Sequence, residues 1–224
     1  MLTKSDRTVT DPIAVLDSLR ADQCMNIGVK DAGIAPESLM LILKEIRERG
    51  KNAYLEVMSD RESDWLQCVQ AAEYAGARAI LGTRRSNTLD KLIAGTKLAY
   101  YPVIDDASAY ARTLEGDSMM VEKLARRACS ADHVSGTLLN PFRIACNPEL
   151  LITSVKNATS KSVFVTGTIH TLERISAIQK MDVDHFAVGT AVFEGSFVNG
   201  GIAEQISAIN SLLDKYKWGK NGVG

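Results

Sequence analysis

Long apolar runs are absent from this sequence. No run approaches the roughly 20 consecutive apolar residues that a helix needs to cross a bilayer. The first residues, MLTKSDRTVTDP, lack the apolar core of a secretory signal. We therefore expect a cytoplasmic protein with no membrane partner.

Basic charge, cysteine and histidine are also scarce. The chain has 26 Lys and Arg against 27 Asp and Glu. Nucleic acid is therefore not expected as a partner, because proteins that bind phosphate backbones usually carry a basic surplus. The four cysteines show no CxxC spacing, and the three histidines form no HxH or HExxH motif. We therefore expect buried thiols and no zinc site.

The residues that are present describe a globular α/β protein. Hydrophobic residues make up 46% of the 224 residues, which is enough for one sizeable core. Apolar periodicity predicts short strands that alternate with amphipathic helices, as is typical of parallel strands covered on both faces. Strands are expected at residues 24–29, 53–57, 79–82, 98–103, 133–139, 162–166 and 185–189. Helices are expected at residues 11–21, 36–49, 62–75, 89–94, 107–129, 148–159, 172–180 and 202–216.

This alternation is compatible with an open doubly wound sheet or with a closed barrel. No GxGxxG turn follows an early strand, which argues against a dinucleotide-binding open sheet. Seven strands are clear, and the weak segment 7–10 is the candidate for the eighth. We therefore predict that residues 1–216 form one (β/α)8 TIM barrel with parallel strands, and that residues 217–224 form a flexible tail.

Two strands near the end of the chain each lead into a Gly-Thr pair. These pairs are Gly167 with Thr168, and Gly189 with Thr190. Glycine lets backbone N–H groups approach a phosphate closely, and threonine adds a hydroxyl. The loops after strands seven and eight of a barrel commonly form a phosphate site. We therefore predict phosphate binding by these four residues; the alternative is that both pairs are only turns.

The segments GTIHTLERI and VGTAVFEG resemble the last quarter of the ribulose-phosphate-binding barrel superfamily, in particular histidine-biosynthesis (ProFAR) isomerase-like proteins. The resemblance implies a (β/α)8 barrel in which Gly167, Thr168, Gly189 and Thr190 contact phosphate. Thr166 replaces the first glycine of the family's pair, and no DxDGT stretch is present. Both departures argue against histidine biosynthesis itself.

Candidate catalytic groups lie at the carboxyl ends of the other predicted strands, where barrels carry their active sites. Lys30 and Asp31 follow the first clear strand. They form either a catalytic rim or an ordinary loop pair in which Asp31 binds backbone donors. Glu56 is a charged residue in an apolar strand, and burial of an unpaired carboxylate costs several kcal/mol. It is therefore either a general base or an ion-pair partner of Lys30 or Arg84.

Further polar groups extend this predicted rim. Arg84 suits a second anion of the substrate, and Thr137 suits substrate hydroxyls. We expect no cofactor and no bound metal, although a divalent cation held by Asp31, Glu56 and Asp105 is an alternative.

These features predict an enzyme of carbohydrate metabolism, either an isomerase or a lyase, that acts on a phosphorylated sugar or sugar-like small molecule. Glu56, Asp31 and Lys30 would carry the catalysis. A Schiff-base aldolase would use Lys30 as its amine. The alternatives are a sensor that resembles the glycerol-3-phosphate-responsive antiterminators and signals to RNA, or a structural subunit. The sequence is also compatible with a homo-oligomer.

Overall fold

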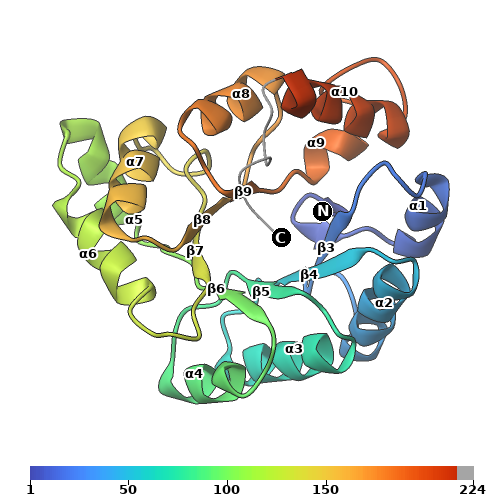
Figure 1. Cartoon of the computed structure of the whole chain (residues 1–224), viewed down its shortest axis with the longest axis horizontal. Helices are drawn as coiled ribbons and strands as arrows, with labels where there is room; N and C mark the ends of the chain where they lie inside the picture. Colours follow the sequence, from blue (N-terminus) through green and yellow to red (C-terminus); the bar gives the residue numbers. More distant parts are fainter. Residues whose placement is uncertain (216–224) are drawn as a thin grey trace.

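The strands of the molecule form a ring, and the helices surround it (Figure 1). The computed structural model describes residues 1–215. The parallel strands, in chain order, are β3 (Asn26–Lys30), β4 (Asn52–Glu56), β5 (Ala79–Leu81), β6 (Ala99–Tyr101), β7 (Gly136–Leu139), β8 (Ser162–Val165) and β9 (His185–Phe186). The predicted α/β fold with parallel strands is therefore confirmed.

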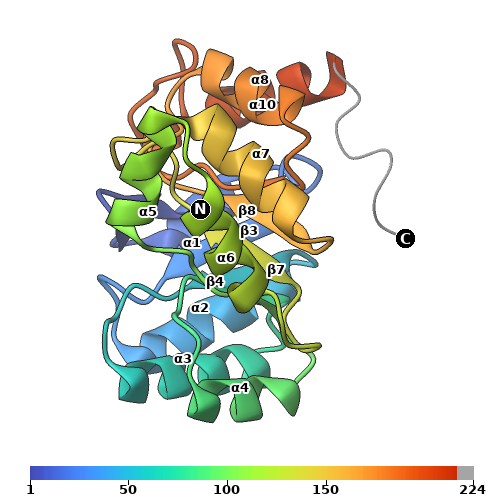
Figure 2. The same ribbon diagram turned by 90° about the vertical axis from the view of Figure 1, so that its left-hand side faces the viewer.

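The helices follow the strands in the predicted order. They are α1 (Pro12–Ser18), α2 (Pro36–Glu48), α3 (Glu62–Tyr74), α4 (Asn87–Ala94), α5 (Ala107–Arg112), α6 (Met119–Ala128), α7 (Pro148–Ala158), α8 (Leu172–Lys180), α9 (Thr190–Phe193) and α10 (Ile202–Lys215), with a short 3-10 helix η1 at Thr113–Glu115. Helices α5, α6 and α7 cover one side of the ring (Figure 2). None of the described helices is long and apolar enough to span a membrane. The predicted tail at residues 217–224 lies outside the described residues.

Local sequence signals explain where several helices begin and end. Asp11 accepts a hydrogen bond from the backbone nitrogen of Ala14 and caps α1, as its position before Pro12 predicts. The one helix predicted at residues 107–129 is instead broken into α5, η1 and α6. Gly116 ends η1 in the left-handed region, with φ of 82°, which an α-helix cannot continue through.

The two seams of the ring are closed by different contacts. Between β6 and β7, Val103 pairs with Leu138 in a parallel bridge. Between β9 and β3, the backbone nitrogen of Leu2 donates to the Gly28 oxygen at 2.7 Å, and the nitrogen of Met1 donates to the Val188 oxygen at 2.8 Å. The first residues of the chain therefore fill the eighth strand position, next to the N-terminus in Figure 1.

This arrangement corrects the expected position of the eighth strand. Met1 and Leu2 make the contacts that close the ring. Strand β1 (Thr3–Lys4) follows them and pairs with β2 (Arg7–Thr8), part of the expected segment 7–10, as a two-stranded antiparallel hairpin. Ser5 and Asp6 make the turn with φ of 49° and 62°. A chain that reverses direction in two residues cannot continue as a parallel strand.

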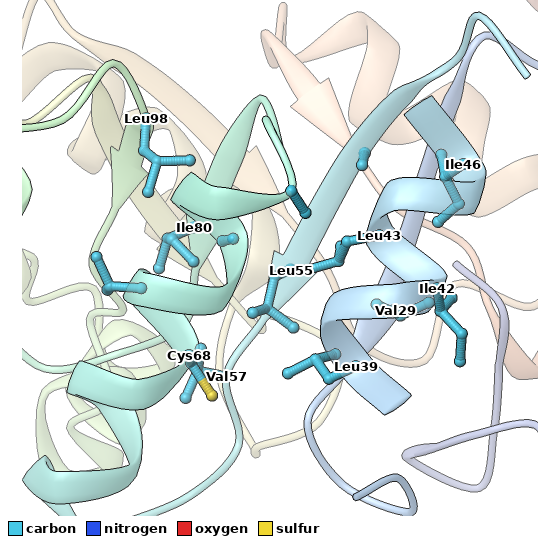
Figure 3. Close-up of a cluster of buried hydrophobic side chains, with 14 of the residues drawn as sticks. Val29, Leu39, Ile42, Leu43, Ile46, Leu55, Val57, Cys68, Ile80 and Leu98 are labelled. Atoms are coloured by element: carbon cyan, nitrogen blue, oxygen red, sulfur yellow. The ribbon is translucent and has the colours of Figure 1, made fainter. Parts of the chain in front are cut away.

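Apolar side chains fill both the outside and the inside of the ring. On the outside, Leu43 of α2 packs toward Leu55 of β4 in a buried cluster (Figure 3). On the inside, a smaller cluster includes Leu81, Tyr101 and Phe164, and the Tyr101 and Phe164 ring centroids lie 5.5 Å apart. Because this cluster blocks the centre of the ring, a ligand has access only at the strand ends.

Candidate functional site

Two adjoining cavities lie at the carboxyl ends of the strands. The loop cavity, of about 610 Å³, is lined by the β1–β2 turn, the ends of β3 and β4, and the loops after β7, β8 and β9. The rim cavity, of about 520 Å³, is lined by the loops after β4, β5 and β6, with side chains that include Trp65 and Arg84. Glu56 and Arg143 line both cavities and therefore lie at their junction.

Lys30 and Glu56 form a buried ion pair at this junction. Parallel pairing of β3 with β4 places the two residues opposite each other. The Lys30 Nζ lies 3.6 Å from the Glu56 Oε2, and the two residues are 4% and 5% exposed. Burial raises the pKa of the Glu56 carboxyl above its ordinary value, although the charges of Lys30 and Arg143 act in the opposite direction.

Asp6 and Arg143 extend this ion pair into a cluster of four charges. The Asp6 Oδ1 accepts a hydrogen bond from Lys30 Nζ at 2.8 Å and forms an ion pair with the Arg143 Nη2. The hydrogen bond from Arg143 is the largest influence that lowers the pKa of Asp6 to about 2. Neither residue was predicted from the sequence. For Arg143, the only sequence signal was a charged residue in a loop that follows a buried strand.

The loop after β8 has an unusual backbone. Gly167 has φ of 79° and Thr168 has φ of 54°. The left-handed region is unfavourable for a β-branched residue such as Thr168, and strain of this kind is concentrated at functional sites. A Cβ at position 167 would lie 2.6 Å from the Arg143 Nε, so that only glycine leaves room for the guanidinium.

The Gly-Thr pairs present free backbone donors. Within residues 1–215, the N–H groups of Gly167, Thr168, Gly189 and Thr190 donate to no protein acceptor. All four residues line the loop cavity. The Thr190 hydroxyl accepts a hydrogen bond from the Ser5 nitrogen at 3.0 Å and keeps its own proton for another acceptor. Donors without a protein partner require water or a ligand.

The structure places Asp31 and Thr137 outside both cavities. The Asp31 carboxylate accepts hydrogen bonds from the backbone nitrogens of Met58 at 2.7 Å and Ser59 at 3.1 Å, and so fastens the loop after β4. Thr137 is fully buried, and its hydroxyl donates to the Pro102 oxygen at 2.8 Å. Alternation along β7 turns Thr137 away from the face that carries Leu138.

Arg84 lies at the rim cavity, on the far side of the Lys30–Glu56 pair from the Gly-Thr loops. Its Nη2 is 2.9 Å from the Asp105 Oδ2, and its side chain is 66% exposed. Asp31, Glu56 and Asp105 are not grouped as ligands for a cation in the described residues. In the part of the chain that the structure describes, no three His, Cys, Asp or Glu side chains are grouped to hold a metal ion.

Comparison with known proteins finds similarity in structure alone. No protein-family model and no curated protein matches the sequence. Orotidine 5'-phosphate decarboxylase from Pyrococcus horikoshii OT3 matches with a TM-score of 0.67 at 15% identity, over 91% of this chain and 93% of that one. A mutant tryptophan synthase alpha-subunit from Pyrococcus furiosus matches with a TM-score of 0.63 at 12% identity, over 93% and 95%.

FabK from Thermotoga maritima also matches, with a TM-score of 0.56 at 14% identity, over 73% of this chain. The match spans only 50% of the FabK chain. The free donors, the buried ion pair and the ring of strands thus belong to a chain whose fold is that of a TIM barrel.

Proposed function

We propose that this barrel is an enzyme that binds a phosphorylated sugar or sugar-like molecule and acts on it as an isomerase or a lyase. One observation carries the proposal: a single cavity is lined both by the two Gly-Thr pairs and by the Lys30–Glu56 pair. The name of one structural neighbour, orotidine 5'-phosphate decarboxylase, also states a phosphorylated substrate. The resemblance to ProFAR isomerase-like proteins favours the isomerase.

In this proposal the Gly-Thr loops hold the phosphate through their free N–H groups. Phosphate binding then positions a carbon of the substrate against Glu56, so that remote binding energy is used for orientation. Glu56, whose pKa is raised by burial, removes a proton from the carbon next to a carbonyl. The electron pair moves to the carbonyl oxygen, and the ammonium group of Lys30 stabilises the enolate that forms.

The same pair of residues serves an isomerase or a lyase, because both reactions pass through an enolate. In an isomerase, Glu56 returns the proton to the former carbonyl carbon while a proton passes between the two substrate oxygens. In a lyase, Glu56 takes the proton of the hydroxyl whose carbon becomes a carbonyl as the carbon–carbon bond breaks, and the enolate that forms is then protonated. A Schiff-base route is less favoured by the geometry. Lys30 is ion-paired with Asp6 on one side and Glu56 on the other, whereas a Schiff base forms from a free amine. Asp31 has no part in this proposal, because both of its carboxylate oxygens accept backbone hydrogen bonds.

Proton exchange tests the proposal across a range of candidate substrates. A panel of phosphorylated aldoses and ketoses would be incubated with the protein in D2O, and loss of the proton next to the carbonyl would be followed by NMR. We expect exchange with at least one member, and a loss of about 10²- to 10⁴-fold in Glu56→Gln. Glu149→Gln, which removes an exposed carboxylate at the start of α7, is the matched control.

Two results would contradict the proposal. One is an absence of exchange and of phosphate binding across the whole panel. The other is exchange that Glu56→Gln leaves at the wild-type rate.

A further inference from the structure

The β1–β2 turn places a carboxylate inside the loop cavity. Asp6 lines this cavity, accepts a hydrogen bond from Lys30 at 2.8 Å and forms an ion pair with Arg143. Its side chain is nevertheless 46% exposed, whereas that of Lys30 is 5% exposed. The carboxylate therefore reaches into the cavity from a surface turn and is not fixed in the core.

The turn itself is strained. Ser5 and Asp6 both have left-handed φ angles, which two-residue hairpin turns usually assign to Asn and Gly. Strained backbone of this kind persists only where its surroundings hold it. Here the holding contacts are the two Asp6 ion pairs and the hydrogen bond from the Ser5 nitrogen to the Thr190 hydroxyl.

Arg143 lies directly beside the free backbone donors. A Cβ on Gly167 would be 2.6 Å from its Nε and 2.9 Å from its Cδ. The guanidinium therefore crosses the same loop whose N–H groups have no protein acceptor, and its side chain is 33% exposed. Paired donors of a guanidinium fit the oxygens of a phosphate or a carboxylate equally well.

The carboxylates of the loop cavity disfavour the binding of a dianion. The acidic side chains Asp6, Glu56 and Glu194 line the cavity, together with the basic side chains Lys30 and Arg143 and the N-terminal amine of Met1. A phosphate that enters beside Arg143 meets the carboxylate that already pairs with it. A phosphate and the Asp6 carboxylate that both contact Arg143 carry like charges, and they repel each other strongly at this short separation. The carboxylate that lies on a strained surface turn is the one that can leave.

We propose that Asp6 competes with the anionic group of the ligand for Arg143, and that Arg143 exchanges its ion pair with Asp6 for one with the incoming phosphate. The Ser5–Asp6 turn withdraws in this exchange. Arg143 is then a ligand-binding residue, and Asp6 is an internal competitor that sets the affinity for phosphate. The inference rests on the proposed phosphate site and adds the residues that control it.

Titration with inorganic phosphate, followed by isothermal calorimetry, tests the exchange. We expect Asp6→Asn to bind phosphate roughly tenfold more tightly than the wild type, and Arg143→Met to bind it roughly tenfold more weakly, since each substitution changes one charge-assisted contact. In the double variant, Asp6→Asn should give no gain, because its effect acts through Arg143. Glu194→Gln is the matched control: it removes a carboxylate of the same cavity for which the described residues show no ion pair.

Limited trypsin digestion reads the withdrawal of the turn in the unaltered protein. Lys4 and Arg7 flank the turn, and both are exposed. Saturating phosphate should increase cleavage after these residues, compared with chloride at the same ionic strength.

The outcomes separate the two proposals. The exchange is overturned if Asp6→Asn tightens phosphate binding no more than Glu194→Gln does. It is also overturned if Asp6→Asn tightens binding by the same factor in the Arg143→Met background as in the wild type. In both cases the phosphate site itself still stands. Cleavage that phosphate does not increase overturns the withdrawal of the turn. Failure of both the wild type and Asp6→Asn to bind phosphate overturns the phosphate site and the exchange together.

Discussion

Glu56 makes a distinctive contribution to stability, which Glu56→Gln exposes. The substitution keeps the shape of the side chain and removes its ability to ionise. Burial raises the pKa of Glu56 in the folded protein above the ordinary value of 4.5. The folded protein therefore binds more protons than the unfolded chain at pH values between these two pKa values. In that window, the stability of the wild type falls as the pH rises. The stability of Glu56→Gln lacks this contribution to the pH dependence, because glutamine does not ionise.

The size of the effect follows from two opposing energies. At 3.6 Å, the Lys30–Glu56 attraction amounts to about 5 kcal/mol with an effective dielectric constant of 20. Removal of each charge from water costs several kcal/mol. Because the pKa is raised, the cost of burial exceeds the attraction. Each pH unit within the window then lowers the stability of the wild type, relative to the variant, by at most about 1.4 kcal/mol.

Urea denaturation followed by circular dichroism measures this difference at a series of pH values from about 4 upward, starting near the reference pKa of a glutamate. Lys30→Met provides a second arm, and should lose about 3–5 kcal/mol at neutral pH because it leaves a buried carboxylate unpaired. The combination of Lys30→Met with Glu56→Gln should recover part of that loss. Glu149→Gln controls for the removal of one negative charge. A wild type that gains stability relative to Glu56→Gln as the pH rises would refute the reasoning.

Two further predictions concern backbone contacts. Lys51 is 3% exposed and donates to two backbone oxygens of the α1–β3 loop, at 3.1 and 2.8 Å. Lys51→Met should therefore lower the free energy of unfolding by about 2–4 kcal/mol in urea denaturation. A loss no larger than that of Lys44→Met, on the exposed face of α2, would contradict this role of Lys51. Thr168→Gly should leave thermal stability unchanged or slightly higher, because relief of about 1–2 kcal/mol of left-handed strain offsets the entropy that glycine costs. It should also weaken phosphate binding, and a clear drop in melting temperature would show that Thr168 is not strained.

Much of the architecture could be predicted from apolar periodicity, because parallel strands and their covering helices each bury one pattern of side chains. The helix predicted at residues 172–180 matches α8 residue for residue. The helix predicted at 107–129 was broken, because periodicity does not show that Gly116 takes a left-handed φ. The eighth strand was misplaced, because the hairpin reverses at Ser5 and Asp6, which lack the glycine of the Asn-Gly or Asp-Gly pairs that signal a two-residue hairpin turn.

The candidate site was predictable in part. The placement of Lys30, Glu56 and the two Gly-Thr pairs at one cavity could be predicted because strand ends converge at one face of a barrel. The sequence does not show that Lys30 lines the loop cavity whereas its neighbour Asp31 does not. This difference depends on the loop after β4, whose backbone N–H groups donate to the Asp31 carboxylate. The burial of Thr137 could not be predicted either, since it depends on strand alternation and on the hydrogen bond to the Pro102 oxygen. Arg143 and Asp6 were missed because nothing in the local sequence indicates which loop folds over Gly167.

The sequence by itself therefore determined the order of strands and helices, the barrel fold and the pair of glycine-threonine loops, because these depend on local patterns of apolar side chains and on the freedom of glycine. The tertiary structure alone decided which charges meet. Asp6 and Arg143 are 137 residues apart in the chain, and they form an ion pair because the closed barrel brings the β1–β2 turn and the loop after β7 to the same cavity. Electrostatic contacts depend on distance in space, which the order of residues does not give.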